Sequence, residues 1–180
     1  MMVRKCDKKK PNRPPEGHPF VWQTADLLTS IAYQAMSINA RRVIDRIQIE
    51  HMDHAGLENG KLIVTHDDFK KFGVSRDFVG DAVDELAYLK LIKINIRGRA
   101  GEGTGYANCF ELTWLPPKGS YLCDDIWQGV TRKRVRAWKQ SERKKARLRR
   151  VKRTPERKLK PGENYFPTPQ SRNIHSANKE

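Results

Sequence analysis

The first clear hydrophobic pattern of the chain follows Ser37. Its apolar positions have the spacing of one face of a helix: Ala40, Val43, Ile44 and Ile47. The Ser37 hydroxyl can accept a hydrogen bond from a first-turn amide, and Gly56 can end the helix. The pattern therefore predicts a helix over residues 38–54. A shorter apolar stretch after Thr24 predicts another short helix, with order beginning near Phe20.

A second set of patterns contains one short strand and two helices. Leu62-Ile63-Val64 is a β-branched and apolar run that is typical of a strand. Thr65 can cap a short helix over residues 67–72, which Gly73 ends. Ser75 precedes a longer helix with one apolar stripe: Val79, Ala82, Val83, Leu86 and Leu89. Two helices separated by a tight turn predict a helix-turn-helix.

From Leu91 onward the hydrophobic period changes to two, which is the period of a strand. Apolar and polar residues alternate along two segments, with the apolar positions at Ile92, Ile94, Ile96, Phe110, Leu112 and Trp114. The loop between them, residues 98–106, contains four glycines, and Pro116-Pro117 cannot continue a ladder. The whole pattern predicts an α+β fold, a winged helix-turn-helix of three to four helices with a β-hairpin as the wing.

The segments that carry these patterns resemble a known family. They are residues 60–69 (GKLIVTHDDF), 72–76 (FGVSR), 82–86 (AVDEL), 91–94 (LIKI) and 108–114 (NCFELTW). In them the chain is similar to the winged helix-turn-helix domains of bacterial plasmid and phage proteins, some of which resemble the DNA-binding domains of replication initiators. The resemblance covers residues 20–116. It implies a DNA-binding protein of plasmid or phage replication or of transcription regulation.

Charge is concentrated at one end of the chain. The net charge is +15, yet residues 17–130 hold 12 Lys or Arg against 15 Asp or Glu, and residues 131–160 hold 16 against 2. Such a polycation favours a polyanionic partner. The predicted organisation is a disordered basic arm (1–18), the winged helix-turn-helix domain (19–117), a basic tail that is helical in part (118–160) and a disordered end (161–180).

Cysteine usage and hydropathy favour a cytoplasmic protein without a membrane partner. Cys6, Cys109 and Cys123 are odd in number and contain no C-x-x-C pair, so a disulfide framework or zinc ribbon is not expected. The N-terminus lacks the apolar region of a signal peptide. No sequence window is long and apolar enough to span a bilayer.

The second helix of a helix-turn-helix presents its N-terminal side chains to base edges in the major groove. Arg76 is well placed for guanine or a phosphate, and Ser75 for a phosphate. Gly80 either permits a close approach of the DNA backbone or is a tolerated defect. The expected contacts of the domain are Lys70, Lys71, Ser75, Arg76, Gly80, Lys93, Arg97 and Arg99. Three aspartates on the same helix face would repel phosphates: Asp77, Asp81 and Asp84.

The tail is expected to add affinity rather than sequence choice. Its expected nucleic-acid contacts are Arg132, Lys133, Arg134, Arg136, Trp138, Arg143, Lys144, Lys145, Arg147, Arg149 and Arg150. Neutralising phosphates with these cations releases counterions. Trp138 can stack on a base. Because this chemistry also suits RNA, the tail by itself leaves DNA and RNA open as partners.

Other motifs could indicate a metal, phosphate or catalytic site, but the residues around them do not support such a site. Residues 50–54 (EHMDH) lack the H-E-x-x-H order and a distant third ligand, so no metal site is expected. The glycines of residues 101–105 lie between two strands, whereas a phosphate cradle requires a strand before them and a helix after them. The pairs Asp67-Asp68 and Asp124-Asp125 diverge on a helix. We therefore expect that the protein has no catalytic residues, no cofactor and no metal, and that it is not an enzyme.

Three functions remain open on the sequence alone. The first is DNA binding by the helix-turn-helix and wing. The second is RNA binding led by the tail, and the third is a protein-interaction module that uses the acidic helix face. Extra apolar residues on the helix of residues 38–54, Ile49 and Met52, permit a homodimer without requiring one.

Overall fold

The computed structural model describes residues 17, 19–99 and 105–153, with the backbone alone for residues 150–153. This part of the chain is α+β, with six α-helices, one 3-10 helix and a three-stranded antiparallel sheet. The predicted fold class is confirmed, and the layout is compatible with a winged helix. The chain divides into two compact units, Met1–Glu142 and Arg143–Glu180.

The helices before the hairpin each follow a polar residue, which was predicted for all of them except the second one along the chain. The helices are α1 (Ala25–Thr29), α2 (Ile31–Gln34), α3 (Ile38–Asp53), α4 (His66–Lys71) and α5 (Arg76–Tyr88). The Ser37 hydroxyl accepts from the amide of Ala40 at 3.2 Å at the start of α3. At α4, Thr65 and Asp68 form a reciprocal capping box. Ser75 occupies the capping position of α5, but its hydroxyl makes no capping hydrogen bond.

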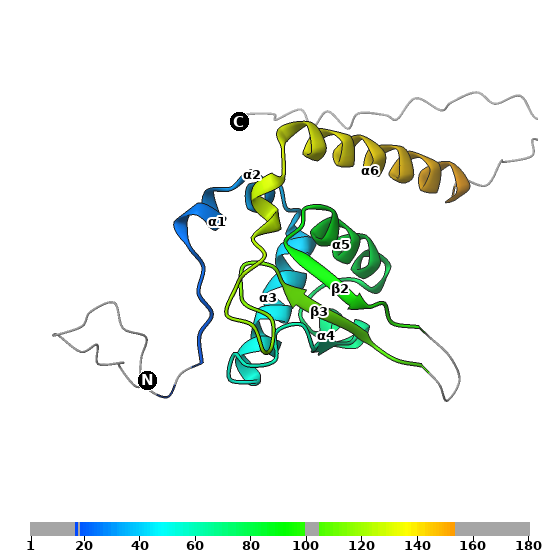
Figure 1. The fold of residues 1–180 in the computed structure, drawn as a ribbon. Coiled ribbons are helices and arrows are strands. Elements are labelled where there is room, and N and C mark those ends of the chain that lie inside the picture. The colour runs from blue at the N-terminus through cyan, green and yellow to red at the C-terminus, as the bar shows by residue number, and fades with distance from the viewer. Residues whose placement is uncertain (1–16, 18, 100–104, 154–180) are drawn as a thin grey trace, which may run out of the picture. The chain divides into compact units, whose positions relative to one another are not determined.

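The sheet places the second strand of the hairpin in the middle. Its strands are β1 (Leu62–Val64), β2 (Ile92–Ile96) and β3 (Asn108–Leu112), in the order β1-β3-β2. Ile92 pairs with Leu112 and Ile94 with Phe110, after which an irregularity shifts the register. Figure 1 shows β2 and β3 extending together away from the helices. The predicted paired ribbon after α5 is therefore confirmed.

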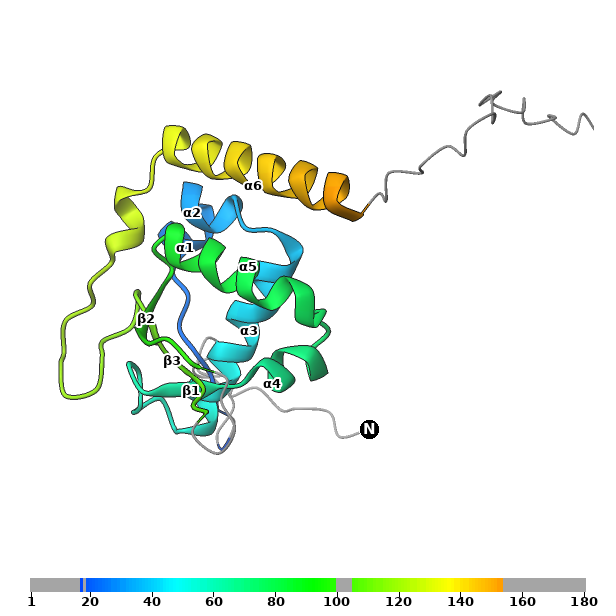
Figure 2. The ribbon, with the colours of Figure 1, turned by 90° about the vertical axis from the view of Figure 1, so that its right-hand side faces the viewer.

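The hydrophobic core lies between the helices and the sheet. α3 contacts α4, α5 and β1, and α5 contacts β2 (Figure 2). The aromatic rings of Phe69 on α4 and Phe110 on β3 meet edge to face, with centroids 6.0 Å apart. The apolar stripes predicted on α3 and α5 are both buried in this core. Burial of these stripes, rather than helix propensity, is the main source of helix stability.

A buried asparagine connects the turn before β1 to the end of β3. Asn59 is 1% exposed, and its Nδ2 donates to the carbonyl oxygens of Leu112 and Leu115 at 2.9 Å each. Its Oδ1 accepts from the amide of Leu112 at 2.8 Å. The sequence predicts a simple turn here. The structure shows a side chain that pairs with backbone groups at the end of β3, beyond the residues that β1 pairs with, as buried polar groups require.

The core continues beyond the boundary predicted at residue 117. After Pro117 the chain returns through a 3-10 helix, η1 (Ile126–Gly129), in which Trp127 is 5% exposed. Val130 is buried and Val135 packs against the same core. The prediction that the domain ends at residue 117 is wrong, because the apolar residues that follow complete the first unit.

The basic tail contains one continuous helix, α6 (Arg132–Arg153). Its 22 residues correspond to a length of about 33 Å. The disordered arm predicted for residues 1–18 lies outside the described residues except for Gly17, and so do the predicted disordered end, residues 161–180, and the hairpin tip, residues 100–104. Among the described helices, none is long and apolar enough to cross a membrane.

Candidate nucleic-acid interface

The start of α5 presents the two residues predicted to read DNA. Ser75 and Arg76 are both exposed, and the Ser75 hydroxyl makes no bond to the helix it precedes. The carbonyl of Ser75 accepts from the amide of Phe78 at 2.8 Å, which closes the first turn. Ser75 and Arg76 therefore adjoin the positive end of a helix dipole, which favours an anion, while Asp77 in the same turn opposes one.

The two lysines of α4 lie beside acidic groups. Lys70 and Lys71 are exposed, and with Asp67 they line a shallow hollow on the surface. The Lys71 ammonium lies 3.9 Å from a carboxylate oxygen of Asp68. Hydrogen bonds from Thr65 lower the pKa of the Asp68 carboxyl below its ordinary value. That carboxylate is therefore a fixed negative charge next to Lys71.

Gly80 and Phe78 give the middle of α5 an unusual surface. A Cβ added at Gly80 would meet nothing within 4 Å, so packing within the described chain does not require glycine there. Phe78 is 48% exposed on the same helix. The sequence analysis did not single out Phe78. The signal that could have identified it as a surface residue is its position outside the apolar stripe of the helix.

An ion pair joins α5 to the hairpin. The Arg97 guanidinium lies 2.9 Å from a carboxylate oxygen of Asp84, and both side chains are largely solvent-exposed. One of the three aspartates on α5 is therefore matched by a cation predicted to bind a phosphate. This contact orients the base of the hairpin against α5.

Lys93 has an internal role in the structure. Its ammonium lies 2.9 Å from Glu111 on β3 and also pairs with Asp124 in the segment after β3. Glu111 is buried. The expectation that Lys93 faces a nucleic acid is not supported by its position, because two carboxylates surround its charge and link the sheet to the returning chain.

Arg99 remains at the exposed stem of the hairpin. Its amide and carbonyl pair with those of Tyr106 at 2.9 and 3.0 Å. A Cβ at the preceding Gly98 would lie 2.7 Å from the Tyr106 carbonyl oxygen, so this position requires glycine. The stem is thus held together up to Arg99, and its side chain projects from a fixed backbone.

An aromatic cluster anchors the first turns of α6 to the end of α5. The guanidinium of Arg134 lies 4.1 Å from the ring centroid of Tyr88, and its Nε donates to the Tyr88 carbonyl at 2.9 Å. The ring of Trp138 lies 4.7 Å from that of Tyr88. Arg134 and Trp138, both predicted to contact nucleic acid, are half-buried in this cluster. Their position makes them anchors of the helix, and Tyr88 is a residue that the sequence analysis missed.

The remaining predicted cations of α6 are exposed wherever the structure describes their side chains. They are Arg132, Lys133, Arg136, Arg143, Lys144, Lys145, Arg147 and Arg149. The side chain of Arg150 lies outside the described residues. α6 holds 13 Lys or Arg and one Glu, a net charge of +12, whereas residues 66–84 hold three Lys or Arg and five Asp, a net charge of −2. Positive charge is therefore concentrated on α6.

The described residues contain no group of three or more His, Cys, Asp and Glu side chains that could hold a metal ion. Comparison of the chain with models of known protein families, with curated proteins and with solved structures gave no match.

Proposed function

We propose that this protein is a winged helix-turn-helix protein that binds duplex DNA and acts in replication or transcription regulation of a plasmid or phage. The observation that carries the proposal is a helix of net charge +12, α6, that follows the α4–α5 pair and the hairpin in the chain, with the 3-10 helix η1 between the hairpin and α6. In this assignment α5 lies in the major groove, the hairpin follows the backbone as a wing, and α6 neutralises phosphates.

Each element contributes a different part of the binding. Arg76 at the start of α5 is the candidate for base readout, because a guanidinium can donate to both O6 and N7 of guanine. Arg99 on the hairpin stem is the candidate for a backbone or minor-groove contact. α6 supplies affinity that does not depend on sequence, since contacts to phosphates release counterions from any duplex.

The test is selection of a preferred duplex from a random pool by the full chain, followed by Kd measurements with Arg76→Ala. We expect the variant to lose about 1–3 kcal/mol on the selected duplex and little on a random one. Lys118→Ala, which removes one positive charge from the loop after β3, is the matched control and should change both affinities alike. Duplex RNA serves as a further competitor, because its deep and narrow major groove does not admit a helix. Equal affinity for RNA and for the selected duplex would favour the tail-led RNA-binding function instead.

The exposed Phe78 supports a second candidate, a protein partner on the α5 face. An aromatic side chain between Asp77 and Asp81 is typical of the core of a protein interface and is not needed for phosphate contact. If a protein occupies this face, Phe78→Ala should leave the affinities for the selected and the random duplex unchanged. The double variant Asp77→Lys with Asp81→Lys should then raise only the affinity for the random duplex. If DNA occupies it, the double charge reversal should raise the affinity for the selected duplex as well.

A further inference from the structure

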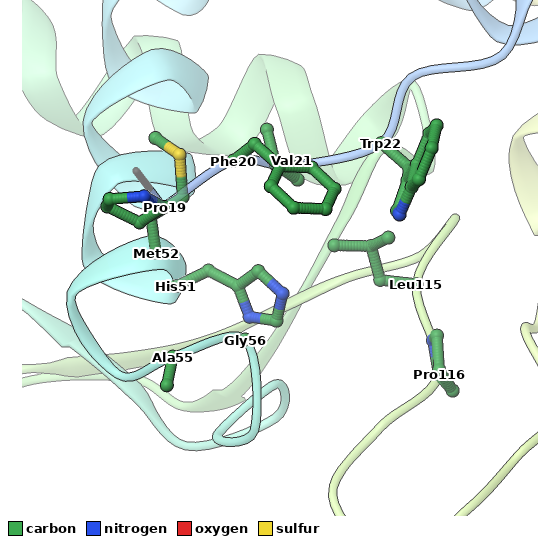
Figure 3. Close-up of a pocket in the computed structure, with 10 residues that line it drawn as sticks. All are labelled: Pro19, Phe20, Val21, Trp22, His51, Met52, Ala55, Gly56, Leu115 and Pro116. Atoms are coloured by element: carbon green, nitrogen blue, oxygen red, sulfur yellow. The ribbon is translucent and has the colours of Figure 1, made fainter. Parts of the chain in front are cut away.

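A pocket of about 360 Å³ lies at the C-terminal end of α3, and its walls contain no residue of the candidate nucleic-acid interface. Three segments that are distant in sequence form it (Figure 3): residues 19–22, the end of α3 with the turn that follows, and the two residues Leu115 and Pro116. Its volume lies at the small end of the range of about 300–1,000 Å³ for ligand sites. That size suits one compact molecule.

Two long-range hydrogen bonds hold the N-terminal wall in place. The indole Nε1 of Trp114 donates to the carbonyl oxygen of Trp22 at 3.1 Å. The side-chain amide of Gln23 donates to Gln48 on α3 at 2.7 Å. These bonds hold the wall at its C-terminal end, at Trp22 and the neighbouring Gln23.

The wall that faces solvent is aromatic. Phe20 is 47% and Trp22 65% exposed, and their rings meet edge to face with centroids 5.2 Å apart. Both rings are therefore far more exposed than the side chains of the core. Two ordered and exposed aromatic rings beside Leu115 offer contact to a flat apolar molecule.

The polar group of the pocket is His51 (Figure 3). It is 6% exposed, and its Nδ1 is buried with no hydrogen-bond partner among the described residues. Buried polar atoms without partners are uncommon in native proteins, and each calls for an explanation. Burial, with a smaller effect from His54, lowers the pKa of the His51 imidazole below its ordinary value. The ring is therefore neutral at neutral pH, with one N–H donor and one nitrogen acceptor.

We propose that this pocket binds a small planar aromatic compound that carries a hydroxyl group, with the hydroxyl hydrogen-bonded to His51. A hydroxyl both donates and accepts, so it can pair with one ring nitrogen of the imidazole in either neutral tautomer. The aromatic ring of the compound packs against Phe20, Trp22 and Leu115. This binding site is an activity separate from the proposed DNA binding and does not depend on it.

The probes are p-cresol and toluene, which differ by the hydroxyl alone. Each is titrated into the full chain while the indole N–H signal of Trp22 is followed by NMR. We expect a saturable shift with p-cresol, and binding about tenfold weaker with toluene, because toluene cannot supply the hydrogen bond. Failure of p-cresol to produce a saturable shift would overturn the proposal.

His51→Phe separates the hydrogen bond from the shape of the pocket. The variant keeps a ring at the buried position, so we expect it to bind p-cresol and toluene with equal affinity. A preference for p-cresol that survives in this variant contradicts the role of His51. Phe20→Ala is a second variant, chosen because an exposed side chain contributes little to folding. It should weaken both probes several-fold while the preference for p-cresol persists, and an unchanged affinity would count against the aromatic wall.

N-acetyl-tyrosinamide distinguishes a free compound from a tyrosine in a peptide. We expect it to bind more weakly than p-cresol, because its backbone amides must lose water at an apolar mouth. If N-acetyl-tyrosinamide binds more tightly than p-cresol, the ligand of the pocket is a tyrosine in a peptide and not a free small molecule. No DNA is present in these titrations, so failure here leaves the proposed DNA binding untouched, and the reverse also holds.

Discussion

The α4–α5 pair and α6 are both helical, but they differ in net charge and in their packing contacts with the core. Residues 66–84 carry a net charge of −2 and belong to a pair of helices packed on the core. α6 carries +12, and its first turns contact the core at Val135 and at the Tyr88 cluster. In the proposed function, the shape that fits a groove and the charge that fits a phosphate backbone are therefore supplied by different elements.

This separation has a physical advantage. In the proposed function, a groove-reading helix with a net negative charge binds random duplexes weakly, so its contribution depends on matching base edges. A strongly basic helix binds any duplex and keeps the reading helix at the DNA surface. In addition, Lys93 and Arg97, which follow residues 66–84 in the chain, are paired with carboxylates of the protein itself.

The largest expected effect comes from removing charge on α6. Replacing Arg136, Arg143, Lys144 and Arg147 by Gln should lower the magnitude of the salt slope on duplex DNA by about 3.6, which is roughly a thousandfold in affinity at 0.1 M salt. Kd values from 50 to 300 mM salt measure the slope. A charge-keeping exchange of Arg and Lys at the same positions is the control and should retain it. A decrease of less than one would show that α6 does not bind phosphates.

The second effect concerns the anchor of α6. Tyr88→Ala removes the ring that contacts Arg134 and Trp138 and should lower the free energy of unfolding by about 2 kcal/mol. Urea denaturation measures it. Tyr88→Phe is the control, since it keeps the ring and loses only the 3.3 Å hydrogen bond to the Arg134 carbonyl, a change of less than about 1 kcal/mol. Equal losses in the two variants would mean that the ring contacts contribute nothing.

The third effect tests how closely α5 approaches DNA. Gly80→Ala should raise the free energy of unfolding by up to about 1 kcal/mol, because alanine favours the helix and its Cβ meets nothing within 4 Å. If the backbone of α5 approaches a phosphate, the same variant binds the selected duplex more weakly. Gly98→Ala is the contrasting variant and should destabilise the protein. A stabilised Gly80→Ala that retains full affinity would eliminate close approach at this position.

The smallest effect comes from the pair between α5 and the hairpin. Asp84→Asn should change stability by no more than about 0.5 kcal/mol, because the pair with Arg97 is exposed. The freed guanidinium should raise the salt slope by up to about 0.9. Asp53→Asn, at the exposed end of α3, removes the same charge elsewhere. Equal changes in both variants would indicate a general charge effect instead of a wing contact.

The local pattern predicted most of the fold of the first unit. Capping residues such as Ser37 and Thr65 and the change of period at Leu91 act within a few residues, so the sequence displays them directly. The boundary after residue 117 was wrong because Trp127 and Val130 become core only when the chain returns to the sheet. Nothing in their immediate neighbours indicates that return.

The sequence predicted that the candidate interface is rich in cations, but not which of these cations face solvent. Arg76, Lys70 and Arg99 are exposed, as a binding role requires. Lys93, Arg134 and Trp138, by contrast, are engaged within the protein. A charge run shows that cations are present, yet it cannot show which of them already have partners.

The sequence by itself determined where the helices after Thr24, Ser37, Thr65 and Ser75 begin, where the hairpin follows, and that nearly all the net positive charge resides after residue 130. Those features depend on hydrogen bonds and side-chain spacing within a turn or two. Only the tertiary structure decided the partners of Arg97 and Arg134, which lie 13 and 46 residues from theirs, and the pocket around His51. Such contacts depend on how the elements pack, and packing brings together residues whose neighbours in the chain give no sign of it.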